Sequence, residues 1–307
     1  MRAFSIAVLL LMLPSVGPLS GQGRVGVDFE PGLVPIVEGV WVYEGALHLD
    51  GEEEQVRTNS LVVIDEAGIV VVDGQDSAEE GRELLAAIRE VSDAPIRYLV
   101  NASPHGDHVN SNTIFADAGA TLVGHVGTYE AMTEVRAAAG ETGPARPELT
   151  FEERMTLRVG ERRLDLHFLG RGHTRGDLVV HLPDKGVAFL SELYFHGVFA
   201  SVSEGYAEEH LETLRRAMEL DARWWIPGHG YVRDQTPEEL EAGLLRYRDN
   251  VAAIHHAVAN RVARGESLEE VLVGIDGDLG AFAELPFYGY LKESAVTGTY
   301  RAEVAKR

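Results

Sequence analysis

Two histidines and an aspartate lie close together in the segment NASPHGDHVNSN, which follows a short apolar run. They are His105, Asp107 and His108, in the pattern HxDH. Imidazole nitrogens and carboxylate oxygens are the ligands that zinc, iron and manganese take in proteins. In a loop of this kind a third histidine is expected where Ser103 stands. The segment by itself indicates either a metal site with one ligand replaced or a polar turn held by its Asp and Asn side chains.

Three later segments carry side chains of the same type, and each follows an apolar strand. GRGHTRGD contains His173, FLSELYFHG contains Glu192, and IPGHG contains His229. If the strands lie side by side, their carboxyl-terminal loops meet at one sheet edge and gather ligands that are distant in sequence. This combination favours a metal site over unrelated turns. We expect the other histidines to be packed or solvated side chains: His48, His167, His181, His210, His255 and His256.

The elements that must position these segments form two β-rich halves. Predicted strands in the first half lie at 39–45, 60–65, 68–73, 96–100 and 120–123, and in the second at 155–159, 163–169, 178–182, 187–190 and 224–226. Helices are predicted from capping boxes at Ser77, Thr236 and Ser267, and also at 109–118, 127–139 and 208–220. Two sheets packed face to face with helices outside follow from this order, which is an α/β (α+β) fold class.

Composition narrows the classes of function. The chain has 307 residues, of which 45% are hydrophobic, and a formal net charge of −22. That acidity argues against nucleic acid or an anionic bilayer as a partner and suits a freely soluble protein. We expect its partner to be a small-molecule substrate. Cysteine is absent, so disulfides, thiolate zinc sites and a cysteine nucleophile are excluded. Any metal must be held by nitrogen and oxygen.

The N-terminus predicts export. An apolar run over residues 3–19 is interrupted by Pro14 and Pro18, and small residues follow. It is too short for a comfortable membrane span and is typical of a secretory signal peptide over residues 1–22; an uncleaved anchor helix is the alternative. We therefore expect a periplasmic or secreted protein without stable membrane insertion after signal removal.

The rest of the chain is expected to fold as one unit. A sandwich over residues 30–235 is followed by a helical extension at 236–307 that packs on the same domain. The long predicted helix in this extension could cover the sandwich or pair with another copy of the chain. The oligomeric state therefore stays open.

Together, the loops, strands and motifs resemble the metallo-β-lactamase superfamily. Its members have an αββα four-layer sandwich and the signature HxHxDH, followed by GHT with a metal histidine, a bridging aspartate and a last histidine. The likeness runs from about Ile36 to Tyr231, and Asp73 matches an acidic residue with a structural or supporting role. It looks closer to periplasmic hydrolase and glyoxalase II-like branches than to the antibiotic-degrading lactamases.

The resemblance implies a set of metal ligands. It gives His105 and His173 to a first metal, and Asp107, His108 and His229 to a second. Two positions depart from the pattern: Ser103 replaces the first histidine as a weak or substituted ligand, and Glu192 stands in place of the bridging aspartate, with Ser191 or His196 as fallbacks.

These departures weaken the first site. A serine hydroxyl is a poor ligand beside an imidazole, so we expect the second site to bind its ion more tightly. Either Glu192 reaches both ions or the protein works with one. The expected cofactor is zinc, as one or two ions, with iron or manganese as alternatives.

The reaction implied is metal-assisted hydrolysis. A bound cation lowers the pKa of its water from about 15.7 towards about 7 and so supplies hydroxide at neutral pH. Asp107 would bind an ion and accept a hydrogen bond from the attacking water. An ester, lactone, thioester or amide is the expected substrate, with a lactam among the amides, and its binding residues are unknown. The alternative is a metal- or ligand-binding protein of this fold with impaired catalysis.

Overall fold

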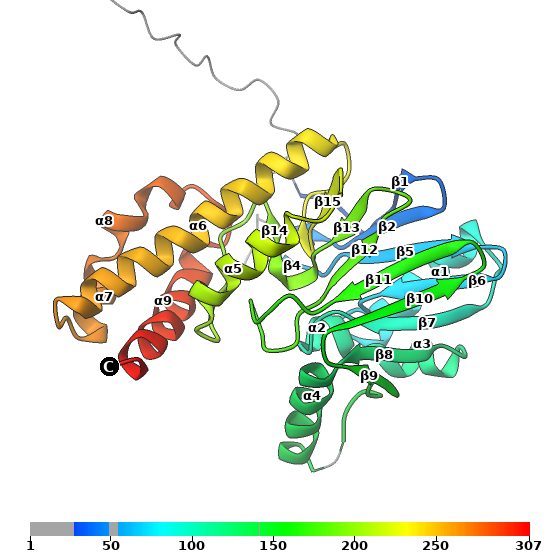
Figure 1. Ribbon diagram of the computed structural model, residues 1–307, viewed down its shortest axis with the longest axis horizontal. Coiled ribbons are helices and arrows are strands. Elements are labelled where there is room, and N and C mark those ends of the chain that lie inside the picture. Colours follow the sequence, from blue (N-terminus) through cyan, green and yellow to red (C-terminus); the bar gives the residue numbers. More distant parts are fainter. Residues whose placement is uncertain (1–27, 49–54, 141) are drawn as a thin grey trace, which may run out of the picture.

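The computed structural model describes residues 28–48, 55–140 and 142–307, so the predicted signal peptide lies outside the described residues. Two large sheets pack face to face, and helices cover their outer sides (Figure 1). The predicted α/β sandwich is confirmed. Within the described residues, no helix combines the length and apolar character needed to cross a membrane.

The first sheet has seven strands and the second has five. In spatial order the first contains β1 (Gly32–Val37), β2 (Val40–Glu44), β5 (Ser60–Asp65), β6 (Gly68–Val72), β7 (Ile96–Asn101), β8 (Thr121–His125) and β9 (Leu149–Phe151). The second contains β10 (Arg154–Val159), β11 (Arg162–His167), β12 (Val179–Leu182), β13 (Val187–Phe189) and β15 (Trp224–Ile226). Two small pairs complete the strands: β3 (Leu47–His48) with β4 (Gln55–Val56), and β14 (Phe195–His196) with β16 (His229–Gly230).

Apolar side chains from both sheets meet in one core. Val70 and Val72 of β6 share a buried cluster with Leu164 and Leu166 of β11. These residues alternate along their strands, so one side chain in two points into the space between the sheets. The other face of β6 carries Val71, which packs with residues of the outer helices. Because both faces of β6 are buried, its sequence GIVVV is apolar throughout.

Parallel pairing brings the functional loops to one edge. In the first sheet β6 and β7 run parallel, with Val72 opposite Val100. In the second sheet β13 and β15 run parallel, with Phe189 opposite Ile226. Parallel neighbours end on the same side, so the loop after each strand emerges beside the other. The sheets therefore hold four loops whose side chains can meet.

Buried Asn59 joins the two halves of the sandwich. Its Oδ1 accepts a hydrogen bond from the amide of Gly45 at 3.0 Å. Its Nδ2 donates to the carbonyls of Pro227 and Gly230, each at 3.1 Å. One side chain thus ties the segment before β5 to the loop that carries His229.

Helices cover both sheets. The first sheet is covered by α1 (Ala78–Val91), α2 (Gly106–Val109), α3 (Asn112–Asp117) and α4 (Val126–Ala138). The second half is followed by α5 (Ala207–Ala217), α6 (Pro237–Ala263), α7 (Leu268–Gly274), α8 (Asp276–Leu279) and α9 (Tyr288–Ala305). Buried residues of α5, α6 and α9, including Leu214, Val251 and Val296, belong to one apolar cluster. Figure 1 shows α6 running along α7, α8 and α9 beside the sandwich.

Local predictions failed at two places. The single helix expected at 109–118 is divided into α2 and α3, because the amide of Ser111 donates to the carbonyl of Gln75 at 3.0 Å and Ser111 Oγ accepts from the amide of Gln75 at 2.7 Å. The box at Ser77 is only half formed. Ser77 Oγ accepts from the amide of Glu80, but the Glu80 carboxylate accepts from the amide of Asp76. The boxes at Thr236 and Ser267 are complete.

Candidate metal centre

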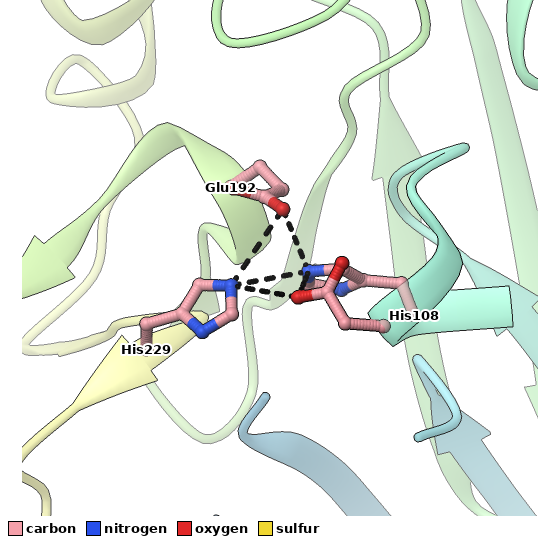
Figure 2. Close-up of side chains that lie close together, drawn as sticks. His108, Glu192 and His229 are labelled. Carbon is pink, nitrogen blue, oxygen red and sulfur yellow. Dashed lines mark hydrogen bonds and ion pairs between the residues drawn. The ribbon is translucent and has the colours of Figure 1, made fainter. Parts of the chain in front are cut away.

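Four side chains from three loops converge at the edge of the sandwich. Asp107 and His108 lie on α2 after β7, Glu192 lies in a short 3₁₀ helix (Ser191–Leu193) after β13, and His229 lies on β16 after β15. One ligand atom from each lies within 4.8 Å of all the others. Figure 2 shows Glu192 and both imidazoles pointing towards one another. His108, Glu192 and His229 are at most 4% exposed.

The spacing of these atoms has the dimensions of a tetrahedral zinc site. His108 Nε2 lies 3.3 Å from His229 Nε2, 2.9 Å from Glu192 Oε1 and 3.4 Å from Asp107 Oδ2. His229 Nε2 lies 3.3 Å from Asp107 Oδ2 and 3.6 Å from Glu192 Oε1. Ligands about 2.0–2.2 Å from a tetrahedral ion are about 3.3–3.6 Å apart, and four of these five distances lie in that range, while the one between His108 and Glu192 is shorter. The residues present therefore fit a metal ion.

A second group shares Glu192. His105 Nδ1 lies 3.4 Å from Glu192 Oε1, and His173 Nε2 lies 3.4 Å from Glu192 Oε2. The ligand atoms of these three residues also lie within 4.8 Å of one another. Each oxygen of the carboxylate thus faces a different imidazole of this group, while Oε1 also faces the first group. Glu192 occupies a bridging position between them.

The hydrogen bonding of the group also favours a cation. Glu192 Oε2 is buried and forms no hydrogen bond with the residues that the structure describes, although it lies 3.4 Å from His173 Nε2. Two imidazole nitrogens, from His108 and His229, face each other at 3.3 Å. Neutral imidazole nitrogens cannot both accept across such a contact unless a proton or a metal lies between them. This set of donor atoms is therefore stable only with a positive charge, from a proton or a metal ion, among them.

Acidic neighbours dominate the electrostatics of the site. Burial lowers the pKa of His108, but the carboxylates of Asp107 and Asp73 outweigh it and raise that pKa well above its usual value. Burial raises the pKa of Glu192, but His173 and His108 outweigh it and hold that pKa well below its usual value. Without a metal, the carboxylate and the protonated imidazole satisfy each other, and a metal would replace the proton.

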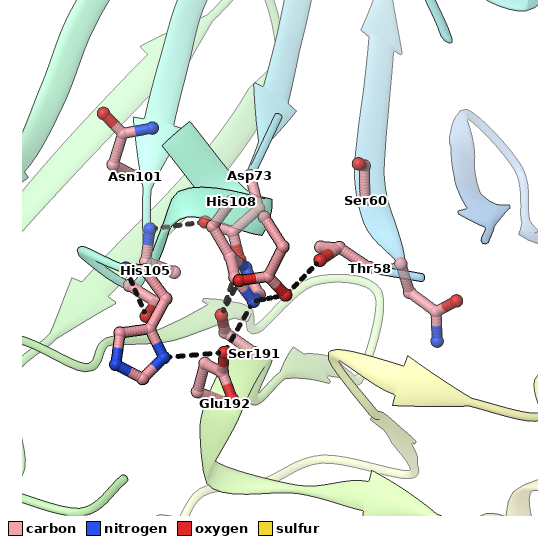
Figure 3. A network of polar contacts seen from close by, with 12 residues as sticks. Thr58, Ser60, Asp73, Asn101, His105, His108, Ser191 and Glu192 are labelled. Carbon is pink, nitrogen blue, oxygen red and sulfur yellow. Dashed lines mark hydrogen bonds and ion pairs between the residues drawn. The ribbon is translucent and has the colours of Figure 1, made fainter. Parts of the chain in front are cut away.

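Asp73 holds His108 in place. Its Oδ2 lies 2.9 Å from His108 Nδ1 and accepts a hydrogen bond from Ser191 Oγ at 2.5 Å (Figure 3). Its Oδ1 accepts from the amide of Ala102 at 2.7 Å. Asp73 has a positive φ of 61°, a rare conformation outside glycine that is enriched in aspartate. A carboxylate on the far nitrogen of a ligand histidine fixes its tautomer and orientation, so the supporting role expected of Asp73 has a structural basis.

Three further contacts support ligand residues and were not predicted. Thr58 Oγ1 donates to Asp107 Oδ2 at 2.9 Å. His173 Nδ1 lies 2.7 Å from the carbonyl oxygen of Ser201. His105 Nε2 lies 3.3 Å from Glu204 Oε1. Thr58 lies far from the motifs in sequence, and Ser201 contributes only a backbone carbonyl, so no spacing signal marks either contact.

Other residues near the motifs have different partners. Ser103 is fully buried, and its Oγ accepts a hydrogen bond from the amide of His105 at 3.3 Å. Ser191, a fallback for the bridging acid, bonds to Asp73. The other fallback, His196, has its Nδ1 against the hydroxyl of Tyr194, and burial lowers its pKa to about 4. Of the three candidates, Glu192 is the one whose carboxylate lies among the histidines.

One histidine that we expected to be an ordinary side chain belongs to a third acidic group. His255 lies near Glu208 and Glu303, between α5, α6 and α9. Lys306 Nζ lies 2.7 Å from Glu208 Oε2 and also bonds to Glu303. The ammonium group already neutralises these carboxylates, so an ordinary ion-pair cluster accounts for them.

A cavity of about 890 Å³ opens at the centre. Ligand residues of both groups line it: His105, Asp107, His173, Glu192 and His229. Residues from outside the sandwich motifs line it too, notably Arg57 beside β4 and Tyr290 on α9. A small molecule in this cavity would reach the candidate metal ligands.

Comparison with known proteins matches residues 54–229 to the family described as the metallo-beta-lactamase superfamily. The chain is 22% identical over 220 residues to metallo-beta-lactamase type 2 of Bacillus sp. (strain 170), which covers 69% of this chain and 82% of the relative. It is 33% identical over 285 residues to the linear primary-alkylsulfatase of Pseudomonas sp. (strain ATCC 19151), which covers 74% of this chain and 52% of the relative.

Solved structures agree on the fold. A metallo-beta-lactamase from Pontibacter korlensis superposes with a TM-score of 0.59 at 21% identity, over 72% of this chain and 100% of that one. The sec-alkylsulfatase Pisa1 from Pseudomonas sp. superposes with a TM-score of 0.69 at 17% identity, over 88% of this chain and 50% of that one. The chain thus spans about half the length of both alkylsulfatases. With more than half of its residues matched to the family, the chain belongs to the metallo-β-lactamase superfamily.

Proposed function

We propose that this protein is a metal-dependent hydrolase of a small ester, lactone, thioester or amide. The observation that carries the proposal is the near-tetrahedral group of Asp107, His108, Glu192 and His229 beside an open cavity. Asp107, Glu192 and His229 of this group line that cavity, so a substrate in the cavity can approach their ligand atoms. A purely structural site would be closed by protein ligands on all sides.

In this proposal zinc, as one or two ions, is the cofactor. His108, His229 and Asp107 hold the tighter ion, Glu192 reaches both positions, and His105 and His173 hold the weaker one. When bound, the metal supplies Lewis-acid activation of water and of the substrate's electrophilic centre.

The chain's own groups then orient the reactants. Asp107 is the candidate for accepting the proton of the attacking water, because its carboxylate lies at the cavity wall with one oxygen held by Thr58. Asp73 fixes the ring of His108 and Ser201 fixes that of His173, so the imidazoles need no reorganisation when substrate enters. No protein nucleophile is required.

A sulfate ester is a second candidate substrate. The sec-alkylsulfatase structure superposes on 88% of the chain. The residues before α6 make up a smaller share than that, so the likeness includes part of the C-terminal helices. Arg57, at the cavity wall, offers a guanidinium for an anionic group. It now pairs with Glu80, with Nε 3.2 Å from Oε1.

We also propose that the protein acts in the periplasm or outside the cell, because of the signal-like residues 1–22. Fractionation of cells that express the full chain with a C-terminal tag would test this. A tagged protein of full length in the cytoplasm would contradict it.

Metal analysis and a substrate panel test the activity. The purified protein should contain zinc and hydrolyse at least one chromogenic lactam, lactone, carboxylic ester, phosphodiester or sulfate ester. A chelator should stop hydrolysis, and added zinc should restore it. Asp107→Asn should lower the rate by at least about 100-fold, while His256→Ala, at an exposed position of α6, should not.

The panel also separates the alternatives. Stoichiometric metal without hydrolysis of any substrate would favour a metal-binding protein with impaired catalysis. Hydrolysis that persists in Asp107→Asn after the metal is removed would contradict the proposal.

A further inference from the structure

The start of α9 lines the same cavity as the candidate metal ligands. Phe287, Tyr290 and Leu291 lie on its wall, together with Phe195 of β14. Phe195 also packs against a ligand, with its ring centroid 4.6 Å from that of His229. Four apolar or aromatic side chains thus adjoin the polar centre, and three of them come from the C-terminal extension.

Tyr290 stands out because it is exposed. Its side chain belongs to a residue that is 78% exposed, although large aromatic residues are usually covered. Phe287 beside it is only 4% exposed and packs in the apolar cluster of the C-terminal helices. Apolar surface at Tyr290 remains in water unless a ligand covers it.

The backbone at Phe287 is strained. Its φ is +64°, in the left-handed region, where a bulky residue is an outlier. Neighbours hold this conformation: the carbonyl of Pro286 accepts a hydrogen bond from the amide of Phe199 at 2.9 Å, and the rings of Phe199 and Tyr288 are 5.0 Å apart. Strain of this kind is concentrated where side chains must be aimed at a ligand.

The segment at 199–201 connects this wall to the ligands. Phe199 bonds to the residue before Phe287, and the amide of Ala200 donates to Asn250 Oδ1 on α6 at 2.7 Å. The next carbonyl, of Ser201, bonds to His173. The C-terminal helices are therefore fixed relative to the candidate centre, and their side chains form a permanent part of its cavity.

We propose that Phe195, Phe287, Tyr290 and Leu291 form an apolar subsite that takes an alkyl or aryl group of the substrate. This inference rests on the proposed function for the identity of the reacting end, which would lie at the metal ligands. The four side chains carry no charge; Phe195 and Phe287 are already buried, so a ligand would remove apolar surface from water mainly at Tyr290 and Leu291. The C-terminal helices thereby set the choice of substrate.

Binding of n-alkanols to the metal-free protein tests the subsite without any turnover. Isothermal titration should show n-octanol binding more tightly than n-butanol, with a gain of about threefold to fourfold for each buried methylene. Tyr290→Ala and Leu291→Ala should reduce this gain per methylene. Val273→Ala, at an 81% exposed apolar position on α7, is the matched control and should leave it unchanged.

Esters provide the second measurement. With 4-nitrophenyl octanoate, Tyr290→Ala should lower kcat/KM by about fivefold or more, whereas 4-nitrophenyl acetate should react as in the unaltered protein. Equal binding of octanol and butanol, or equal effects of Tyr290→Ala on both esters, would overturn the subsite. Selective octanol binding without hydrolysis of any substrate in the panel would instead retain the subsite and refute the hydrolase.

Discussion

The two ligand groups that share Glu192 differ in how completely the chain builds them. The group with Asp107, His108 and His229 has four donor atoms, counting Glu192, and three of its four residues are buried, while the side chain of Asp107 is 34% exposed. In the other group the side chain of His105 is 33% exposed, and its supporting partner Glu204 is 38% exposed. Ser103, the departure from the family pattern, falls in this second group. The difference teaches that one substitution can weaken one position while the neighbouring one keeps all its ligands.

Removal of a ligand histidine from each group should give the largest change in zinc affinity. His229→Ala removes a ligand of the complete group and should lower its zinc affinity by more than about 100-fold, beyond the loss usual for a supporting residue. His173→Ala should leave that tight ion in place and remove only the weaker one. Competition with a fluorescent zinc chelator measures both. Equal losses in the two variants would show that the groups form a single cooperative site.

The carboxylates that bond to the ligand histidines should also differ, with a larger loss of zinc affinity at Asp73 than at Glu204. Asp73→Asn should lower the affinity of the tight ion by about 10–100-fold, because buried Asp73 fixes the ring of His108. Glu204→Gln should change zinc affinity by less than about 10-fold, because its contact with His105 is partly solvated. The same chelator titration compares them. A larger effect at Glu204 would reverse the ranking of the two groups.

Ser103→His would sharpen the comparison by restoring the family signature. A third imidazole should raise the affinity of the weaker position by about 10-fold, and the purified protein should then retain closer to two ions for each chain. Ser103→Ala is the control and should change metal content little. Elemental analysis gives the stoichiometry, and thermal unfolding checks that the larger side chain is accommodated at this buried position. Unchanged stoichiometry in a well-folded variant would contradict the assignment of Ser103.

The smallest expected effect is a pH dependence of the folding stability of the metal-free protein. Burial lowers the pKa of His105, but its hydrogen bonds with Glu192 and Glu204 raise it to about 10. The folded pKa lies above the unfolded value of about 6.5, so this stabilisation is complete below about pH 6.5 and is lost as the pH rises to about 10.

Because the His105 side chain is one-third exposed, the loss should be small, with a decrease in Tm of about 2 °C. His105→Asn should lack this component. Scanning calorimetry of both metal-free proteins between pH 7 and pH 10 measures it, and an increase in Tm over this range would have the wrong sign.

Sequence reasoning predicted the sandwich because each strand carries its own pattern. The apolar run of β6 and the segment 224–226 mark their strands without help from distant residues. Two elements had no comparable signal. In β9 (Leu149–Phe151) two of the three residues are exposed, and α9 has buried residues at few positions, so neither shows clear periodicity. Tertiary contacts stabilise both.

Part of the candidate site could be predicted from the sequence and part could not. Histidines and acids after strands could be grouped from sequence order, and the structure brings those residues together. Contacts made through backbone atoms could not be predicted. His173 bonds to the carbonyl of Ser201, and every residue has such a carbonyl, so the sequence does not mark this one. Proximity in sequence is also a poor guide for Asn101, Thr174 and Asp177, which lie close to ligand histidines along the chain. Asn101 pairs with Asn112 instead, and Thr174 bonds to Asp177.

The Asn59 side chain has a consequence for how the centre assembles. It bonds to the carbonyls on both sides of His229 while accepting from Gly45, so the last ligand is anchored to the first half of the chain. A fragment that ends before β15 would retain His105, Asp107 and His108 but would lack both His229 and the partner carbonyls of this amide. The ligand group of Asp107, His108, Glu192 and His229 therefore needs the chain as far as Gly230 to be complete.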